Sequence, residues 1–102
     1  MHIAFVRTGG FAAIRLTVSL DTEELPADQA SHLGKLVKEA DFFELPERLE
    51  PEAYGADRFE YQVTIGVEHK RHSVVVHEAA APESLRPLLN YLTTLAMVSK
   101  KR

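Results

Sequence analysis

The period of the hydrophobic pattern switches between that of strands and that of helices along this chain, and this alternation constrains the fold most. Residues 3–6 form an apolar run, and Thr8-Gly9-Gly10 follows as a turn signal, because glycine reaches positive φ without a steric penalty. Residues 14–20 then alternate apolar and polar side chains, which is the period of a strand with one buried face. The pattern therefore predicts that the chain begins with a β-hairpin.

The next segments repeat the change of period. After Pro26 the apolar residues recur at helical spacing up to Ala40, which predicts an amphipathic helix. Residues 59–65 return to the alternation of strands, and residues 71–77 are predicted to be a further strand centred on Val74-Val75-Val76. A second helix is predicted after Ser84, a suitable N-cap, by an apolar stripe that contains Leu85, Leu88, Leu89, Leu92, Leu95 and Ala96.

The order of the predicted elements is ββαββα. We therefore predict an α+β fold, with a four-stranded antiparallel sheet and two helices packed on one face, because this arrangement buries every apolar stripe. A length of 102 residues predicts a single domain, 1–102, with one core. The opposite face of the sheet would be open to solvent or to a partner and would carry Arg15, Thr17, Glu60, Gln62 and Thr64.

Residues 41–57 are the least regular part of the chain. Phe42 and Phe43 are adjacent, so they cannot both point into one face of an element. We predict an ordered loop that is pinned by Phe42, Leu45 and Tyr54. Loops of this length without structure of their own are uncommon and are often functional.

Composition excludes several classes of function. The chain has no cysteine, which excludes a disulfide scaffold, a thiolate metal site and a cysteine nucleophile. A net charge of -3 argues against binding to nucleic-acid phosphates. No apolar run approaches the roughly 20 residues that span a bilayer, so no membrane partner is expected. No signal peptide is evident at the start, and we expect a cytoplasmic protein.

Neither a metal site nor a catalytic site is evident. The chain has five histidines but no H-E-x-x-H motif, and His69 and His72 would point to opposite faces of one strand. No serine lies in a G-x-S-x-G motif, and Gly9-Gly10 lies between two strands rather than before a helix. We therefore expect no catalytic residue, no metal and no cofactor, and a protein that is not an enzyme.

The remaining unusual feature is the aromatic residue at the predicted hairpin tip. If Ile14 and Leu16 face the core, parity places Phe11 on the opposite face of the sheet. A large apolar ring is costly there unless something covers it. Phe11 could fold over the sheet edge, a bulge could shift the parity, or Phe11 could anchor a partner protein. The residues alone leave these three interpretations open.

Around this tip the sequence resembles the emfourin family, whose members are bacterial inhibitors of protealysin, a thermolysin-like zinc metallopeptidase. The resemblance begins at Thr8-Gly9-Gly10-Phe11-Ala12, and Ala13 stands where the family often has glycine. It continues in matching order through most of the chain, in Ser19-Leu20-Asp21-Thr22, Leu25-Pro26, Ala40-Asp41-Phe42-Phe43-Glu44-Leu45-Pro46, Ala56-Asp57-Arg58-Phe59-Glu60-Tyr61 and Leu85-Arg86-Pro87-Leu88-Leu89.

The resemblance implies a proteinaceous inhibitor that binds the active-site cleft of a protealysin-like or thermolysin-like metallopeptidase. The zinc then belongs to the enzyme, so the inhibitor itself needs no cofactor. We expect the inhibitory contact at the tip, in Thr8, Gly9, Gly10, Phe11 and Ala12, and a second contact patch at Phe42 and Phe43.

Two alternative functions stay open. One is a non-inhibitory interaction domain that uses the open sheet face. The other is a small enzyme or ligand carrier with a site under the long loop, which would need a pocket with convergent polar groups. For the protein itself we expect a monomer or a weak homodimer.

Overall fold

The computed structural model describes residues 1–9, 15–51 and 59–100, and residues 10–14, 52–58 and 101–102 lie outside the described part. The strands are β1 (His2–Gly9), β2 (Leu16–Asp21), β3 (Arg48–Leu49), β4 (Phe59–Val67) and β5 (Lys70–His77). The α-helices are α1 (Ala27–Glu39) and α2 (Arg86–Lys100). Short 3-10 helices link them and are η1 (Thr22–Glu24), η2 (Phe42–Glu44) and η3 (Glu78–Ala80).

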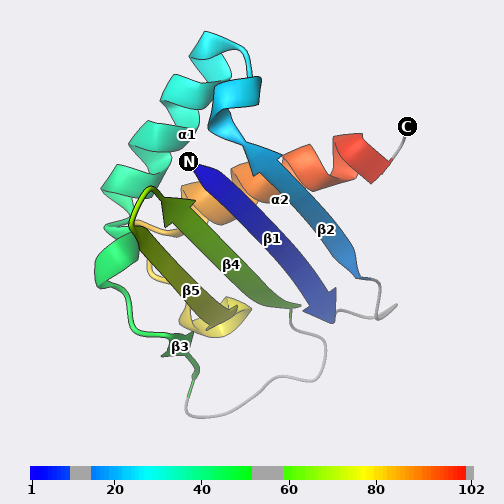
Figure 1. The fold of residues 1–102 in the computed structure, drawn as a ribbon. Coiled ribbons are helices and arrows are strands. Elements are labelled where there is room, and N and C mark those ends of the chain that lie inside the picture. Colours follow the sequence, from blue (N-terminus) through cyan, green and yellow to red (C-terminus); the bar gives the residue numbers. More distant parts are fainter. Residues whose placement is uncertain (10–14, 52–58, 101–102) are drawn as a thin grey trace.

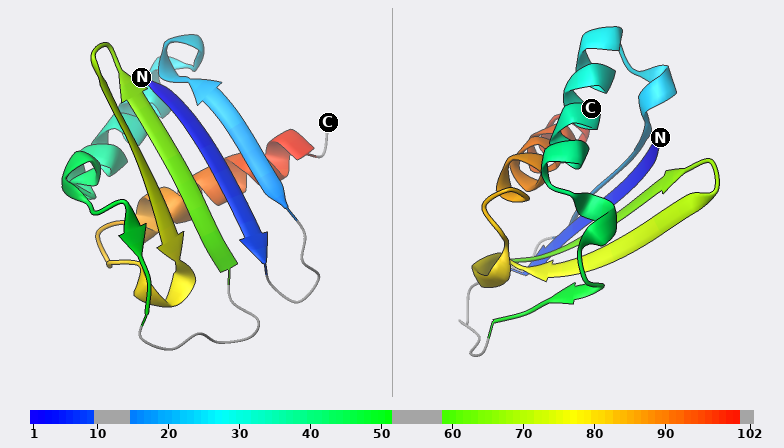
Figure 2. Two further views of the ribbon diagram at one scale, coloured as in Figure 1. Left: turned by 60° about the horizontal axis from the view of Figure 1, so that its bottom comes forward. Right: turned by 90° about the vertical axis from the view of Figure 1, so that its left-hand side faces the viewer.

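The strands form one sheet in the order β2-β1-β4-β5-β3 (Figure 1). β1 is paired on both sides, so that Ile3 lies beside Leu20 of β2 and beside Ile65 of β4. Both helices lie on the same side of this sheet (Figure 2). The fold is therefore α+β with both helices on one face, as the sequence predicts.

The prediction of a four-stranded antiparallel sheet is wrong, because the structure has a five-stranded mixed sheet. The additional strand is β3, which pairs with β5 in the parallel direction. β3 lies in the segment that was expected to be a loop. The N–H of Val75 donates to the carbonyl of Glu47 at 2.8 Å and fixes this segment along β5. A strand of two residues is too short to show an alternating pattern, so the hydrophobic period does not reveal it.

The segment before β3 is anchored largely as the sequence predicts. Phe42 is buried in the core, and Leu45 packs against the core from the side. An imidazole nitrogen of His72 lies 2.6 Å from the carbonyl oxygen of Leu45, which ties the segment to β5. Tyr54, the third predicted anchor, lies outside the described residues.

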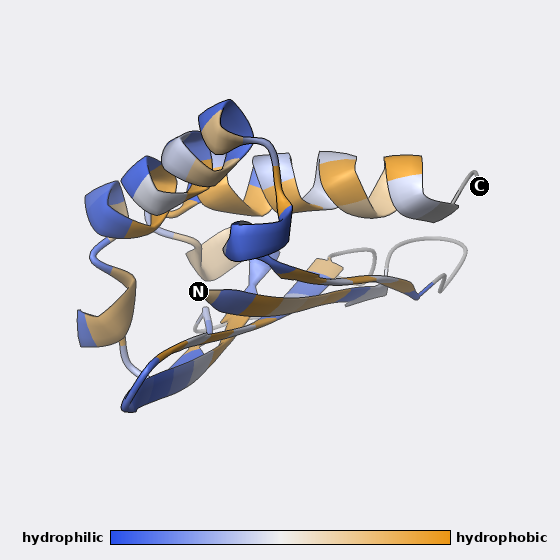
Figure 3. Cartoon of the chain, turned by 45° about the horizontal axis from the view of Figure 1, so that its top comes forward, coloured by the Kyte–Doolittle hydropathy of each residue, from blue (hydrophilic) through white to orange (hydrophobic). Residues whose placement is uncertain are grey.

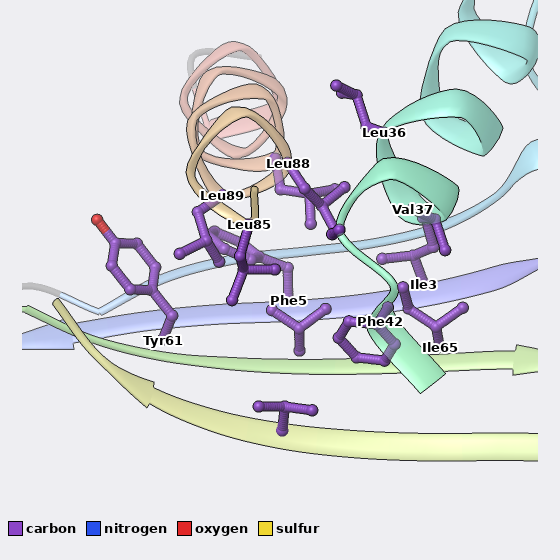
Figure 4. Packing of buried hydrophobic residues seen from close by; sticks show 14 of the residues in the cluster. Ile3, Phe5, Leu36, Val37, Phe42, Tyr61, Ile65, Leu85, Leu88 and Leu89 are labelled. Atoms are coloured by element: carbon purple, nitrogen blue, oxygen red, sulfur yellow. The ribbon is translucent and has the colours of Figure 1, made fainter. Parts of the chain in front are cut away.

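The core lies between the helices and one face of the sheet, where the apolar residues gather in Figure 3. Leu85, Leu88 and Leu89 of α2 point toward the sheet in Figure 4. α1 adds Leu33, Leu36 and Val37 to the same layer. None of the helices within the described ranges is long and apolar enough to cross a membrane.

The other face of the sheet carries the predicted polar residues, together with the half-buried Ala4, Val6 and Val75. Arg15, Thr17, Glu60 and Gln62 are exposed, and Thr64 is half-buried. The hydroxyl oxygens of Thr64 and Ser73 lie 2.7 Å apart on neighbouring strands, so this pair is linked by a hydrogen bond across the face.

We predict that Leu88→Ala lowers the free energy of unfolding by about 2–5 kcal/mol, because it removes a fully buried side chain and leaves a cavity. Chemical denaturation followed by circular dichroism measures this loss. Ser31→Ala on the exposed side of α1 is the control and should change stability by less than about 0.5 kcal/mol. An equal effect of the two variants would contradict the assignment of Leu88 to the core.

Candidate functional site

The predicted contact residues at the hairpin tip fall partly inside and partly outside the described chain. Thr8 and Gly9 end β1 and pair with Glu60 and Phe59 of β4. Gly9 has a φ of 93°, a conformation that residues with a side chain rarely adopt. Gly10, Phe11 and Ala12 lie outside the described residues. The base of the tip is therefore fixed to a central strand pair up to its last described residue.

Aromatic rings on the helix side of the sheet support this base. The guanidinium carbon of Arg7 lies 4.1 Å from the centre of the Phe59 ring, within the range of a cation–π contact. The centres of the Phe59 and Tyr61 rings are 6.5 Å apart, and those of Tyr61 and Phe5 are 6.0 Å apart. A continuous set of contacts thus leads from the core to the end of β1 that carries the tip.

Glu78 of η3 holds the start of β4 at the same end of the sheet. One of its carboxylate oxygens accepts a hydrogen bond from the backbone N–H of Phe59 at 3.2 Å. Burial raises the pKa of the Tyr61 hydroxyl above its ordinary value, and the nearby negative charge of Glu78 raises that pKa further. The Arg7 guanidinium acts in the opposite direction on the pKa of Tyr61, by its charge and by a hydrogen bond.

The supporting residues were not among those predicted from the sequence, although one signal was present. Residues 3, 5 and 7 of β1 share the face that points toward the helices, and Arg7 is the charged member of that set. A cation at a position whose parity is that of the core requires a specific partner, and the Phe59 ring supplies it. The pattern could therefore have marked Arg7 but not Glu78, which lies far along the chain.

The predicted second patch is only partly available to a partner. Phe42 is 1% exposed and belongs to the core, whereas Phe43 is half-buried. The centres of their rings are 5.7 Å apart, edge to face, and the Lys70 ammonium lies 5.0 Å from the centre of the Phe43 ring. An exposed contact here would therefore come from Phe43 and Lys70.

The structure does not bring this patch beside the hairpin tip. His72, whose ring contacts both phenylalanines, is in register with Ile65, and Ile65 is in register with Ile3. Ile3 lies six residues from Gly9 on β1, about 20 Å along an extended strand. The two predicted contact regions therefore lie toward opposite ends of the sheet.

His72 and His77 make structural contacts. Within the part of the chain that the structure describes, no group of three or more metal-ligating side chains is present. The Nδ1 atom of His77 accepts a hydrogen bond from the N–H of Ala79 at 3.2 Å, and His72 contacts the carbonyl of Leu45. Both residues therefore hold the connecting segments that lie beside β5.

An open cleft of about 820 Å³ lies at one end of the sheet. It is lined by the first residues of β1 and by the turn between β4 and β5, so it lies at the other end of β1 from Gly9. Its lining mixes both signs of charge, with Asp21 and Glu68 facing the same space as Lys70. The ligand-carrier alternative placed its site under the long loop, where two other open hollows lie, one of about 500 Å³ beside Glu47 and Arg48 and one of about 310 Å³ beside Phe42 and Phe43.

We predict that Tyr61 resists ionisation in the folded protein. Because its folded pKa is raised above the ordinary 10.0, its contribution to stability is complete below that pH and is lost as the pH rises through the folded pKa. Ultraviolet titration of the phenolate should show a late component that disappears in Tyr61→Phe. Tyr91→Phe is the matched control, and loss of the late component in that variant instead would contradict the placement of Tyr61.

The chain can now be compared with known proteins. A search of curated proteins and a search of solved structures found no match to the chain. The family model described as Emfourin matches residues 5–93 of the 102-residue chain, from within β1 to within α2. This match confirms the resemblance and covers α1, the strands β2 to β5 and parts of β1 and α2. The chain therefore belongs to the emfourin family, which is an inhibitor family.

Proposed function

We propose that this chain inhibits a protealysin-like or other thermolysin-like zinc metallopeptidase and is not itself an enzyme. The inhibitor binds the active-site cleft of the peptidase through the tip of the hairpin between β1 and β2. Membership of the emfourin family supports the class of function. The structural observation that most supports this proposal is the pairing of β1 with β4 up to Gly9. This pairing attaches the tip directly to the middle of the sheet.

The firmly held base matters because rigid binding elements lose little conformational entropy on association. Gly9 pairs with Phe59, whose ring lies under Arg7 and whose N–H is held by Glu78. Movement of the end of β1 would disturb all of these contacts. A tip that keeps its shape in the cleft also favours tight binding over cleavage.

The composition of the tip suits the proposed cleft. Thermolysin-like peptidases favour a large apolar side chain just after the scissile bond, and Phe11 supplies one. Gly9 and Gly10 lack side chains that would keep the backbone away from the enzyme. Backbone carbonyl oxygens of the tip could then approach the zinc of the enzyme or its bound water. Every metal in this proposal belongs to the peptidase.

The alternative use of the open sheet face is less well supported. That face carries exposed polar residues such as Thr17, Glu60 and Gln62. Some of its polar groups are already paired within the fold, as the hydroxyls of Thr64 and Ser73 are. Protein interfaces usually have a core that is depleted in charge and rich in aromatic residues. The tip offers an aromatic residue, and the centre of the open face does not.

We predict that Phe11→Ala weakens inhibition by at least about 30-fold, the equivalent of about 2 kcal/mol for an interface anchor. Titration of a thermolysin-like peptidase with the wild-type protein should remove activity stoichiometrically, and the variant should require a large excess. The thermal midpoint of the variant should stay close to that of the wild type.

Phe43→Ala is the matched control, since it removes the same ring from the other predicted patch. We expect a smaller loss of inhibition, because this ring is half-buried in its own fold. Full inhibition by Phe11→Ala would contradict the tip as the contact. Unchanged peptidase activity with the wild-type protein, across several thermolysin-like enzymes, would contradict the proposed function.

A further inference from the structure

β2 forms an edge of the sheet, and its pairing shows which backbone groups point outward. The N–H of Thr22 donates to the carbonyl of Met1 at 2.9 Å, in the register that pairs His2 with Asp21. Successive residues of a strand direct their backbone groups to alternate sides, so the even-numbered residues of β2 bond to β1. The remaining residues direct their N–H and C=O groups to the open edge, and these are Thr17, Ser19 and Asp21.

The sequence of this edge lacks the proline, lysine and internal charge that usually prevent pairing with another strand. Natural edge strands are kept short or carry proline, lysine or other charges. β3, at the opposite edge, is two residues long and carries an ion pair of 2.9 Å between Arg48 and Glu50. β2 has six residues, Leu-Thr-Val-Ser-Leu-Asp, and its one charge is at its end. The edge formed by β2 is therefore ready to accept a further strand.

Apolar surface adjoins the open edge on the helix side. Val18 and Leu20 of β2 are half-buried there. The last turns of α2 pass beyond β2 in both Figure 1 and the left view of Figure 2. These turns hold the exposed large apolar residues found among the described side chains, Met97 at 44% and Val98 at 54% exposure. A strand added to β2 would cover Val18 and Leu20, whereas Met97 and Val98 lie off the buried stripe of α2 that faces the sheet.

We propose that the strand added here is β2 of a second copy, paired antiparallel about a two-fold axis that crosses the seam at Val18. In this register Arg15 lies opposite the partner's Asp21, and Asp21 lies opposite the partner's Arg15. Two ion pairs therefore form by symmetry on the open face. Thr17 pairs with the partner's Ser19 through the outward backbone groups of both residues.

The register follows from charge and parity together. Opposed residues of an antiparallel pair lie on the same face of the sheet, so the pairing can shift only in steps that keep parity. Centring the pair on Thr17 or on Ser19 moves Arg15 away from the partner's Asp21. Centring it on Val18 places Arg15 opposite the partner's Asp21. It also places Leu16 opposite the partner's Leu20 on the helix side.

The dimer keeps apart the two ends of β2 that lead to the proposed inhibitory tips. Because the two copies of β2 run in opposite directions, the ends that lead to residues 10–14 lie at opposite ends of the seam. The proposal does not rest on the inhibitory function, and its test measures mass rather than inhibition. Failure of one proposal therefore leaves the other standing.

Sedimentation or light scattering across a concentration series tests the pairing. We expect the mass to rise from 11.4 kDa toward twice that value at protein concentrations on the order of 100 μM, as expected for a small interface. Arg15→Glu places like charges opposite each other at two symmetric positions and should weaken association about tenfold. Asp21→Asn keeps the acceptor for the N–H of Glu23 and should weaken association less.

Two further variants make the test specific. Ser19→Pro removes an N–H that points to the open edge, so it should abolish the dimer while retaining the circular dichroism spectrum of the fold. Arg71→Glu changes an exposed arginine on the same face but on β5, and it should leave association unchanged. A mass that stays at 11.4 kDa up to about 1 mM would overturn the proposal. Equal association of Arg15→Glu and Arg71→Glu would also overturn it, whether or not Ser19→Pro folds.

Discussion

The insertion of β1 between β2 and β4 is the constraint on which the rest of this structure depends. Ile3 and Phe5 are buried because β1 has a neighbour on each side and the helices above it. The same pairing carries β1 to Gly9, so the segment proposed to bind the peptidase leaves from the interior of the sheet. β2 remains as an edge because β1 takes its place in the middle. The proposed inhibitory tip and the proposed dimer edge are thus two consequences of one strand order.

Long periodic segments could be predicted from the sequence, and short or pairwise features could not. The alternation in residues 59–65 and the leucine stripe of α2 extend over enough residues to define a period, and both elements are confirmed. β3 has two residues and forms because β5 offers an edge to pair with. The information that predicts this strand therefore lies in β5 and not in the sequence of β3 itself. The pattern also showed that Phe42 and Phe43 face different ways, but only packing reveals that Phe42 is the buried one.

The candidate site also has residues that could be predicted from the sequence and residues that could not. The sequence identified Gly9 and the residues that follow it, because two adjacent glycines and an aromatic residue at a turn are unusual in themselves. It did not identify the support beneath them, since the contact of Arg7 with Phe59 joins residues far apart in the chain. Local composition thus marks an unusual segment of the sequence, whereas the support of the strand that leads to it depends on pairs that only the fold brings together.

The strand order also has a consequence for the synthesis of the chain. Ile3 completes its place in the sheet only when Ile65 reaches it, so the first strand must wait for more than half of the polypeptide before both its edges are covered. Contacts of such long sequence separation slow folding, because a large loop must close before they form. Pairing of Ile3 with Ile65 requires closure of the chain between them, whereas β1 and β2 can pair before that closure.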